Sequence, residues 1–198
     1  MSINVCNDRS MASITSLPSG VSGGSLVLIS TVTASSSSTV TFDSGIDSTY
    51  KEYQIHIIQA HCSSDNQILQ VGFRDGSTAY DATKTTTYFA SQHKEDASGG
   101  AVGYNTDQDQ AQATGLQSLG QPNNNDDASI SGTLHLFDPS NSTFVKHFIA
   151  RANLNESSTQ SDNFIAGYIN TATAITRVQF KSSSGTLDSG VIKLYGVS

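Results

Sequence analysis

Five histidines are the residues of this chain best suited to bind a metal or transfer a proton. His56 and His61 share one apolar segment, and His135 and His147 lie in two later ones. Side chains alternate between the faces of a strand, so a spacing of five predicts that His56 and His61 point to opposite faces. No Cys and His spacing of a zinc site accompanies them. We therefore expect ordinary hydrogen-bonded histidines and no metal.

The aspartates lie in segments rich in Asn, Gly and Ser. Their closest pairs are Asp43 with Asp47, Asp107 with Asp109, and Asp126 with Asp127. Such oxygen ligands can bind Ca²⁺, but no stretch has the regular spacing of a calcium loop. Asp in a turn also bonds to local backbone without any metal. Turn formation is the interpretation we prefer, and a loop calcium site is the alternative.

Motifs of catalysis are missing from the sequence. None of the three glutamates has a setting that suggests the paired carboxylates of a glycosidase. There is no G-x-S-x-G nucleophile elbow and no phosphate-binding loop. Tryptophan, the usual stacking platform for sugars, is absent, although Tyr80, Tyr88 and Tyr104 could take its place. The sequence predicts a protein that is not an enzyme and needs no cofactor.

Charge and composition limit the classes of partner that the protein can bind. The chain has 10 Lys and Arg against 17 Asp and Glu, and the basic residues are scattered, which disfavours nucleic acid and anionic membranes. No run approaches the roughly 20 apolar residues of a membrane-spanning helix, and no export signal is recognisable. Cys6 and Cys62 are therefore expected to be free thiols. Charged residues make up only 14%, a bias common in subunits of large assemblies.

Short runs with period-two alternation, separated by turn formers, recur from residue 25 onward. This pattern predicts an all-β fold: an antiparallel two-sheet β-sandwich of jelly-roll type at 25–198, preceded by an extended N-terminal arm at 1–24. Residues 85–92 favour a strand, with a helical turn as the alternative. The other expected strands span residues 25–30, 39–42, 52–61, 67–74, 128–137, 143–153, 163–170, 174–182 and 190–197.

Local sequence predicts how some strands are joined and covered. The serines at 35–38 predict a hairpin loop, and the apolar run 26–29 predicts a strand covered on both sides. The turn formers at 43–49 would deliver Tyr50 and Tyr53 into the core. A symmetric loop after residue 137 would place Phe137 opposite Phe144 in a hairpin.

Two regions lack this regular pattern and are the candidate interaction sites. Residues 95–127 are expected to form long surface loops around a short strand near 114–119, with Tyr104 in a recognition loop. Residues 1–24 are either a flexible tail or, as we prefer, a docking arm. The apolar anchors of that arm would be Ile3, Val5, Met11, Ile14 and Leu17.

Several motifs resemble a group of structural proteins of tailed, mainly aquatic, bacteriophages. They are LPSGVSGG at 17–24, FDSGIDSTY at 42–50, TKTT at 83–86, GTLHLF at 132–137, FVKHF at 144–148 and GVIKLYG at 190–196. The resemblance covers most of the chain, and its motifs are structural rather than catalytic. It implies a virion protein without fixing its position in the virion, and it transfers no functional residue.

We therefore expect a structural protein on the exterior of a tailed phage particle, assembled in the host cytoplasm. A capsid decoration (cement) protein, anchored by its arm to the major capsid protein or to a neck or tail protein, suits the short chain best. Strands apolar on both faces, such as 55–58, suggest contacts between copies in a homo-oligomer such as a homotrimer. The alternative is a head or tail fibre subunit acting as a receptor- or carbohydrate-binding module.

Overall fold

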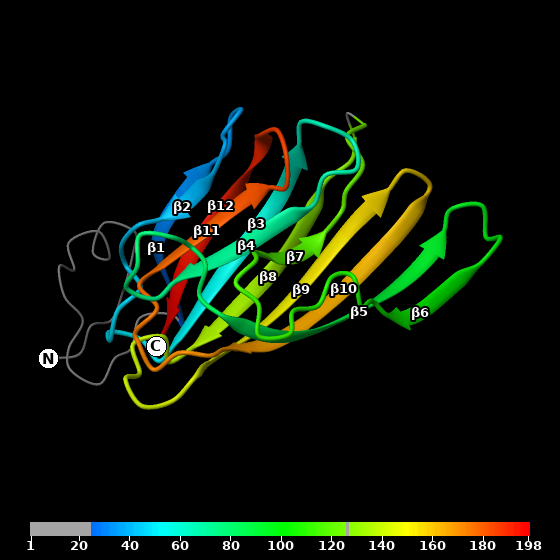
Figure 1. Ribbon diagram of the computed structural model, residues 1–198. Helices are drawn as coiled ribbons and strands as arrows, with labels where there is room; N and C mark the ends of the chain where they lie inside the picture. The colour runs from blue at the N-terminus through cyan, green and yellow to red at the C-terminus, as the bar shows by residue number, and fades with distance from the viewer. Residues whose placement is uncertain (1–24, 126) are drawn as a thin grey trace, which may run out of the picture.

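The computed structural model describes residues 25–125 and 127–198, and these residues form an all-β protein (Figure 1). Two antiparallel sheets contain all of its strands, with the order β1-β12-β3-β8-β9-β10-β5-β6 in the larger and β2-β11-β4-β7 in the smaller. The expected all-β, two-sheet antiparallel fold is thus confirmed. The strands are β1 (Leu26–Thr33), β2 (Val40–Phe42), β3 (Glu52–Cys62), β4 (Leu69–Arg74), β5 (Lys84–Lys94), β6 (Gly100–Tyr104), β7 (Gln117–Gly120), β8 (Ile130–Phe137), β9 (Lys146–Glu156), β10 (Thr159–Ile169), β11 (Arg177–Ser182) and β12 (Leu187–Val197).

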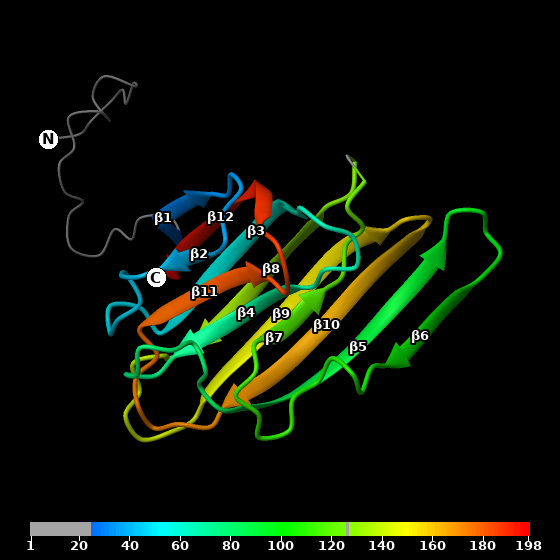
Figure 2. The ribbon, with the colours of Figure 1, turned by 45° about the horizontal axis from the view of Figure 1, so that its top comes forward.

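The core lies between the two sheets. Alternate residues of the long strands are buried there, because side chains of a strand point to opposite faces. Phe73 of β4 meets Phe148 of β9 across the gap, with ring centroids 5.0 Å apart. We call this side of the eight-stranded sheet its inner face and the opposite side its outer face. In Figure 2 the four shorter strands overlie only part of the inner face, and the β5–β6 hairpin extends past them.

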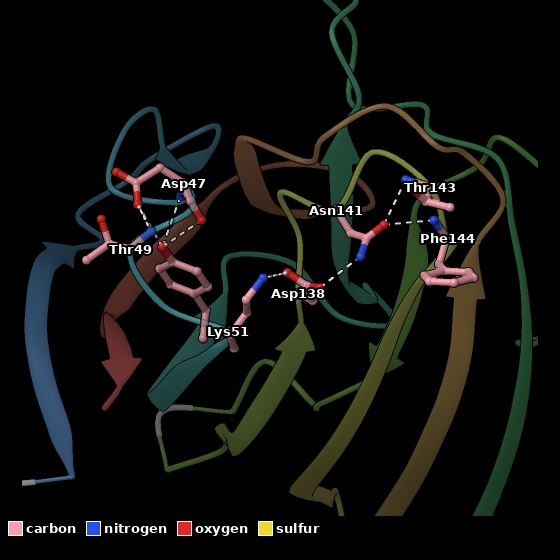
Figure 3. A network of polar contacts seen from close by, with 8 residues as sticks. Asp47, Thr49, Lys51, Asp138, Asn141, Thr143 and Phe144 are labelled. Carbon is pink, nitrogen blue, oxygen red and sulfur yellow. Dashed lines mark hydrogen bonds and ion pairs between the residues drawn. The ribbon is translucent and has the colours of Figure 1, made fainter.

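The turn before β3 positions two tyrosines, as expected. The Tyr53 hydroxyl accepts a bond from the Asp47 N–H at 3.0 Å and lies 3.1 Å from the Asp47 carbonyl and carboxylate oxygens. Asp47 also accepts a bond from the Thr49 N–H, which closes the turn (Figure 3). Tyr53 is fully buried, and Tyr50 packs against its ring at 5.7 Å, edge to face. The polar residues of this stretch therefore build the fold.

The prediction that His56 and His61 point to opposite faces is wrong. The pairing of β3 with β8 shifts between Ile57 and Ala60, and its pairing with β12 shifts between Ile58 and His61. Gln59, which lies within both shifts, has a φ of +48°. This β-bulge inserts one residue, so the buried positions change from odd to even numbers and both histidines point away from the core. Gly190 of β12 lies opposite the bulge at a φ of +123°, and a Cβ there would collide with Ala60.

Two predicted hairpin features are also wrong. The serines at 35–38 do not close a hairpin, because β1 and β2 belong to different sheets. The Phe137–Phe144 pair does not form either, since the loop is asymmetric and β8 aligns Leu136 with Phe148. In that loop, Asn141 accepts bonds from the N–H groups of residues 143 and 144, which leaves the Phe144 side chain 70% exposed (Figure 3).

The remaining departures concern exposure and length. The run 26–29 is not covered on both sides, because β1 is an edge strand on which Leu26 and Leu28 are exposed. The segment 85–92 is strand throughout, so the helical alternative is wrong. The loops expected at 95–127 contain the end of one hairpin, β5–β6, and the short strand there is β7 at Gln117–Gly120.

Candidate functional site

The histidines are distributed over separate contacts. His61 Nδ1 lies 2.7 Å from Asp188 and its Nε2 lies 3.1 Å from the Asn125 carbonyl oxygen. His135 Nδ1 lies 2.7 Å from Glu52, and the His56 ring lies against Tyr195. Within residues 25–125 and 127–198, no three His, Cys, Asp or Glu side chains come together as a metal site.

His61 has an acceptor at each ring nitrogen, and only the imidazolium form can donate to both. Burial alone would lower the pKa of His61, but its hydrogen bonds to Asp188 and to the Asn125 carbonyl outweigh burial and raise that pKa. The His61 ring therefore ties the loop before β8 to strands β3 and β12.

Tyr104 is the one candidate interaction residue that the structure describes. It ends β6 and is not in a loop; it lies opposite Phe89 of β5 on the outer face. Its side chain is half exposed, and its hydroxyl donates to Asp109 at 2.6 Å. The anchors of the predicted arm, Ile3, Val5, Met11, Ile14 and Leu17, lie outside the described residues.

An aromatic row continues from Tyr104 across the outer face. Phe89 stacks on Phe164 of β10, with centroids 4.8 Å apart and planes 6° apart. The Arg151 guanidinium of β9 lies 4.9 Å from the centre of the Phe164 ring, in cation–π contact. Arg151 also binds Asp162 through two nitrogens, at 3.0 and 2.5 Å, which fixes the guanidinium over the ring.

Exposed apolar side chains gather on this same outer face. Strand register places on it seven of the eight large hydrophobic side chains that are exposed in the described part of the chain. The exception is Phe144, in the loop before β9. The seven are Leu26, Leu28, Ile58, Phe89, Val102, Tyr104 and Ile149. They are spread over β1, β3, β5, β6 and β9, with polar residues between them, and Phe89 and Tyr104 lie side by side. Exposed hydrophobic side chains concentrated on one face give that face the character of a contact surface.

The inner face carries a polar hollow where the small sheet stops. This cavity of about 190 Å³ lies beside edge strand β7 and is lined from β5, β7, β9, β10 and the loop after β6. Its lining includes Tyr88, Ser118, Glu156, Ser161 and Asn163. Two further hollows, of about 320 and 310 Å³, share Glu156 with it. We call the three together the Glu156 groove.

Several polar groups in the groove are fixed in place. Asn163 donates from Nδ2 to the Leu119 carbonyl oxygen at 3.0 Å and accepts from the Ser161 hydroxyl at 3.1 Å. Ser118 Oγ is buried and has no hydrogen-bond partner of ordinary geometry. Burial raises the pKa of Glu156, and no Lys, Arg or His forms an ion pair with it among the described residues.

Two buried lysines flank the same residue at the opposite end of the sheet. Lys84 and Lys146 both align with Ile169 of β10, and neither has any exposed surface. Lys84 Nζ donates to the Gly115 carbonyl at 2.6 Å, and Lys146 Nζ donates to the carbonyls of Phe144 and Thr171 at 3.0 and 2.9 Å. Each ammonium group thus ties loop backbone to the sheet.

Sequence reasoning did not identify the groove or the buried lysines. Glu156 and Ser118 stand in no motif, and only pairing between distant strands brings them together. The lysines do stand in motifs, TKTT at 83–86 and FVKHF at 144–148, but Lys is the residue that sequence patterns place in solvent most readily.

Compared with known proteins, the chain matches no family model and no curated protein sequence. Within the described residues there is also no helix long and apolar enough to cross a membrane.

Proposed function

We propose that this chain is a structural protein on the exterior of a tailed phage particle, a capsid decoration protein. The observation that carries the proposal is that one face of the eight-stranded sheet, the outer face, carries seven of the eight exposed large hydrophobic side chains of the described residues. A subunit surrounded by other subunits buries such a face in assembly, whereas a free monomer keeps it in water.

We also propose that the sandwich is a jelly roll with two added hairpins. If β5–β6 and β9–β10 are set aside, eight strands remain, in the order β1-β12-β3-β8 in one sheet and β2-β11-β4-β7 in the other. Renumbered from 1 to 8 in chain order, the two sheets read 1-8-3-6 and 2-7-4-5. That order corresponds to two interleaved Greek keys, an architecture frequent in viral capsid and lectin domains. The added hairpins lie together at one edge of the large sheet and widen the outer face.

The phage-like motifs fit a structural role because their residues make close packing contacts. A Cβ on Gly132 would collide with the Arg151 carbonyl, and a Cβ on Gly196 would collide with the Tyr50 ring. Lys84 and Lys146 of two other motifs are the buried lysines described above. Motifs of this kind preserve a scaffold and require no active site.

A second candidate function is a receptor- or carbohydrate-binding module on a head or tail fibre. The Glu156 groove favours it, because the groove combines a hollow shape with fixed amides, hydroxyls and one carboxylate. Neither candidate function uses catalysis.

Labelling of purified particles tests the main proposal. An antibody raised against residues 25–198 should decorate the capsid surface of intact virions in electron micrographs. Labelling confined to the tail tip would support the second candidate instead. Absence of the protein from purified particles would refute both virion roles.

A further inference from the structure

We propose that the Glu156 groove binds a neutral, hydroxyl-rich ligand, with one sugar ring in the hollow formed by Tyr88, Ser118, Glu156, Ser161 and Asn163. The inference rests on the second candidate function and is independent of the decoration role. It also moves the recognition site from the Tyr104 side of the sheet to the opposite, inner face.

Charge excludes the main alternatives to a neutral ligand. Glu156 is the only charged side chain that lines the central hollow, so an anion would meet repulsion and no counter-charge. A Ca²⁺ ion takes six to eight oxygen ligands, usually from several carboxylates, and the hollow offers one carboxylate. An apolar ligand would leave the amides and hydroxyls of the lining unpaired.

The lining groups match what a sugar hydroxyl requires. A hydroxyl group donates one hydrogen bond and accepts others, and Ser118 and Tyr88 can do the same, whereas Ser161, which donates to Asn163, can accept. Ser118 Oγ is buried without a partner of ordinary geometry, a condition that a ligand hydroxyl would relieve. Glu156 can accept from two neighbouring hydroxyls of one ring. Burial raises the pKa of Glu156, although a hydrogen bond with Ser161 lowers it.

Size and rigidity favour a single ring with room for extension. A volume of about 190 Å³ corresponds to roughly six water molecules at about 30 Å³ each. The adjoining hollows share Glu156 and extend the groove toward Pro122 on one side and Gly100 on the other. Gly120 packs closely against the lining residue Asn163, because a Cβ there would collide with Leu154 and with the Asn163 amide. A short oligosaccharide could therefore lie along the groove with one residue inserted.

Nuclear magnetic resonance titration of the full chain tests the proposal. The probes are glucose, galactose, mannose, rhamnose and N-acetylglucosamine, each added up to about 100 mM, a range suited to millimolar affinity. At least one should give saturable shifts of the backbone amides of Gln92, Ser118 and Asn163. Glucuronic acid should bind at least about tenfold more weakly than glucose if glucose is a ligand, because its carboxylate would approach Glu156.

Two variants and two matched controls test whether the sugar binds in the Glu156 groove. Glu156→Gln should weaken binding about tenfold or more, and Ser118→Ala about threefold, with unchanged melting temperatures. Glu95→Gln, at the exposed hairpin tip, and Ser91→Ala, on the outer face, should bind as the wild type does. No saturable shift with any of the five sugars, or equal binding by Glu156→Gln, would overturn the proposal. Particle labelling is unaffected by either result, so the decoration role is judged separately.

Discussion

Replacing Lys84 by Met should stabilise the protein, although it removes a hydrogen bond from the core. Burial lowers the pKa of Lys84 from 10.5 to about 8, so at neutral pH the native state holds a charged group that burial disfavours. A shift of that size corresponds to about 3 kcal/mol. The substitution loses the bond to the Gly115 carbonyl, worth about 1.5–3 kcal/mol, but Gly115 is exposed and its carbonyl can bind water instead. We expect Lys84→Met to raise the unfolding free energy by about 1 kcal/mol at pH 7.

The pH dependence provides the sharper test of this reasoning. Below pH 8 both folded and unfolded chains hold the Lys84 proton, so the full destabilisation is present. Between pH 8 and 10.5 the folded chain releases the proton while the unfolded chain keeps it, so stability rises with pH. From pH 7 to pH 9.5 this one group should add about 2 kcal/mol to the wild type and nothing to Lys84→Met.

Urea denaturation at both pH values measures the effect. Tyr53 and Cys62, whose pKa values burial raises, oppose the rise in both proteins and cancel in the difference between them. Lys94→Met, at an exposed site, is the matched control and should follow the wild type. Parallel pH profiles for the wild type and Lys84→Met would refute the account of Lys84 as a buried, destabilised ammonium group.

Four further outcomes test other parts of the structure. We propose that copies of the chain associate through the outer face, so Ile149→Glu, which places a charge at its centre, should abolish self-association in analytical ultracentrifugation and change the unfolding free energy by no more than about 0.5 kcal/mol. An oligomer that survives the substitution would refute an interface on that face. Tyr53→Ala should destabilise by about 3–5 kcal/mol and Tyr53→Phe by about 1 kcal/mol, and a Tyr53→Ala variant as stable as the wild type would contradict its core position. Because the pKa of His61 is raised in the folded state, protonated His61 contributes its full stabilisation below pH 6.5, and that stabilisation is lost as the pH rises through the higher pKa of the folded state. The variant His61→Gln should therefore flatten the dependence of the unfolding free energy on pH in that window. An unchanged pH dependence would refute the imidazolium assignment. Cys62 is buried with a raised pKa, so iodoacetamide should modify it only after denaturation, as peptide mass analysis would show.

The sequence was sufficient to predict the fold class and most strands, because period-two alternation reports which residues a sheet buries. The Tyr53 turn was predictable too, since Asp47 and Thr49 carry their bonding preferences locally. Alternation failed at the Ile57–Ala60 bulge, where one inserted residue exchanges the two faces. It also failed in the loop after Phe137, whose length and capping by Asn141 shift the hairpin register.

The candidate sites depended on contacts that local sequence does not encode. The exposed hydrophobic side chains share one face only because β1, β3, β5, β6 and β9 are aligned in one sheet. The groove forms where β7 ends beside the longer strands of the other sheet, so it depends on the unequal widths of the two sheets. Lys84 was missed because a charged residue inside a core contradicts composition rules that hold for most lysines.

Cryo-electron microscopy of the virion tests the central proposal most directly. We predict that the two-sheet sandwich fits density on the capsid exterior, with the outer face of the large sheet, around Ile149 and Phe89, pressed against a neighbouring subunit. Density in which that face is fully open to solvent, or a particle that lacks the protein, would contradict the proposal.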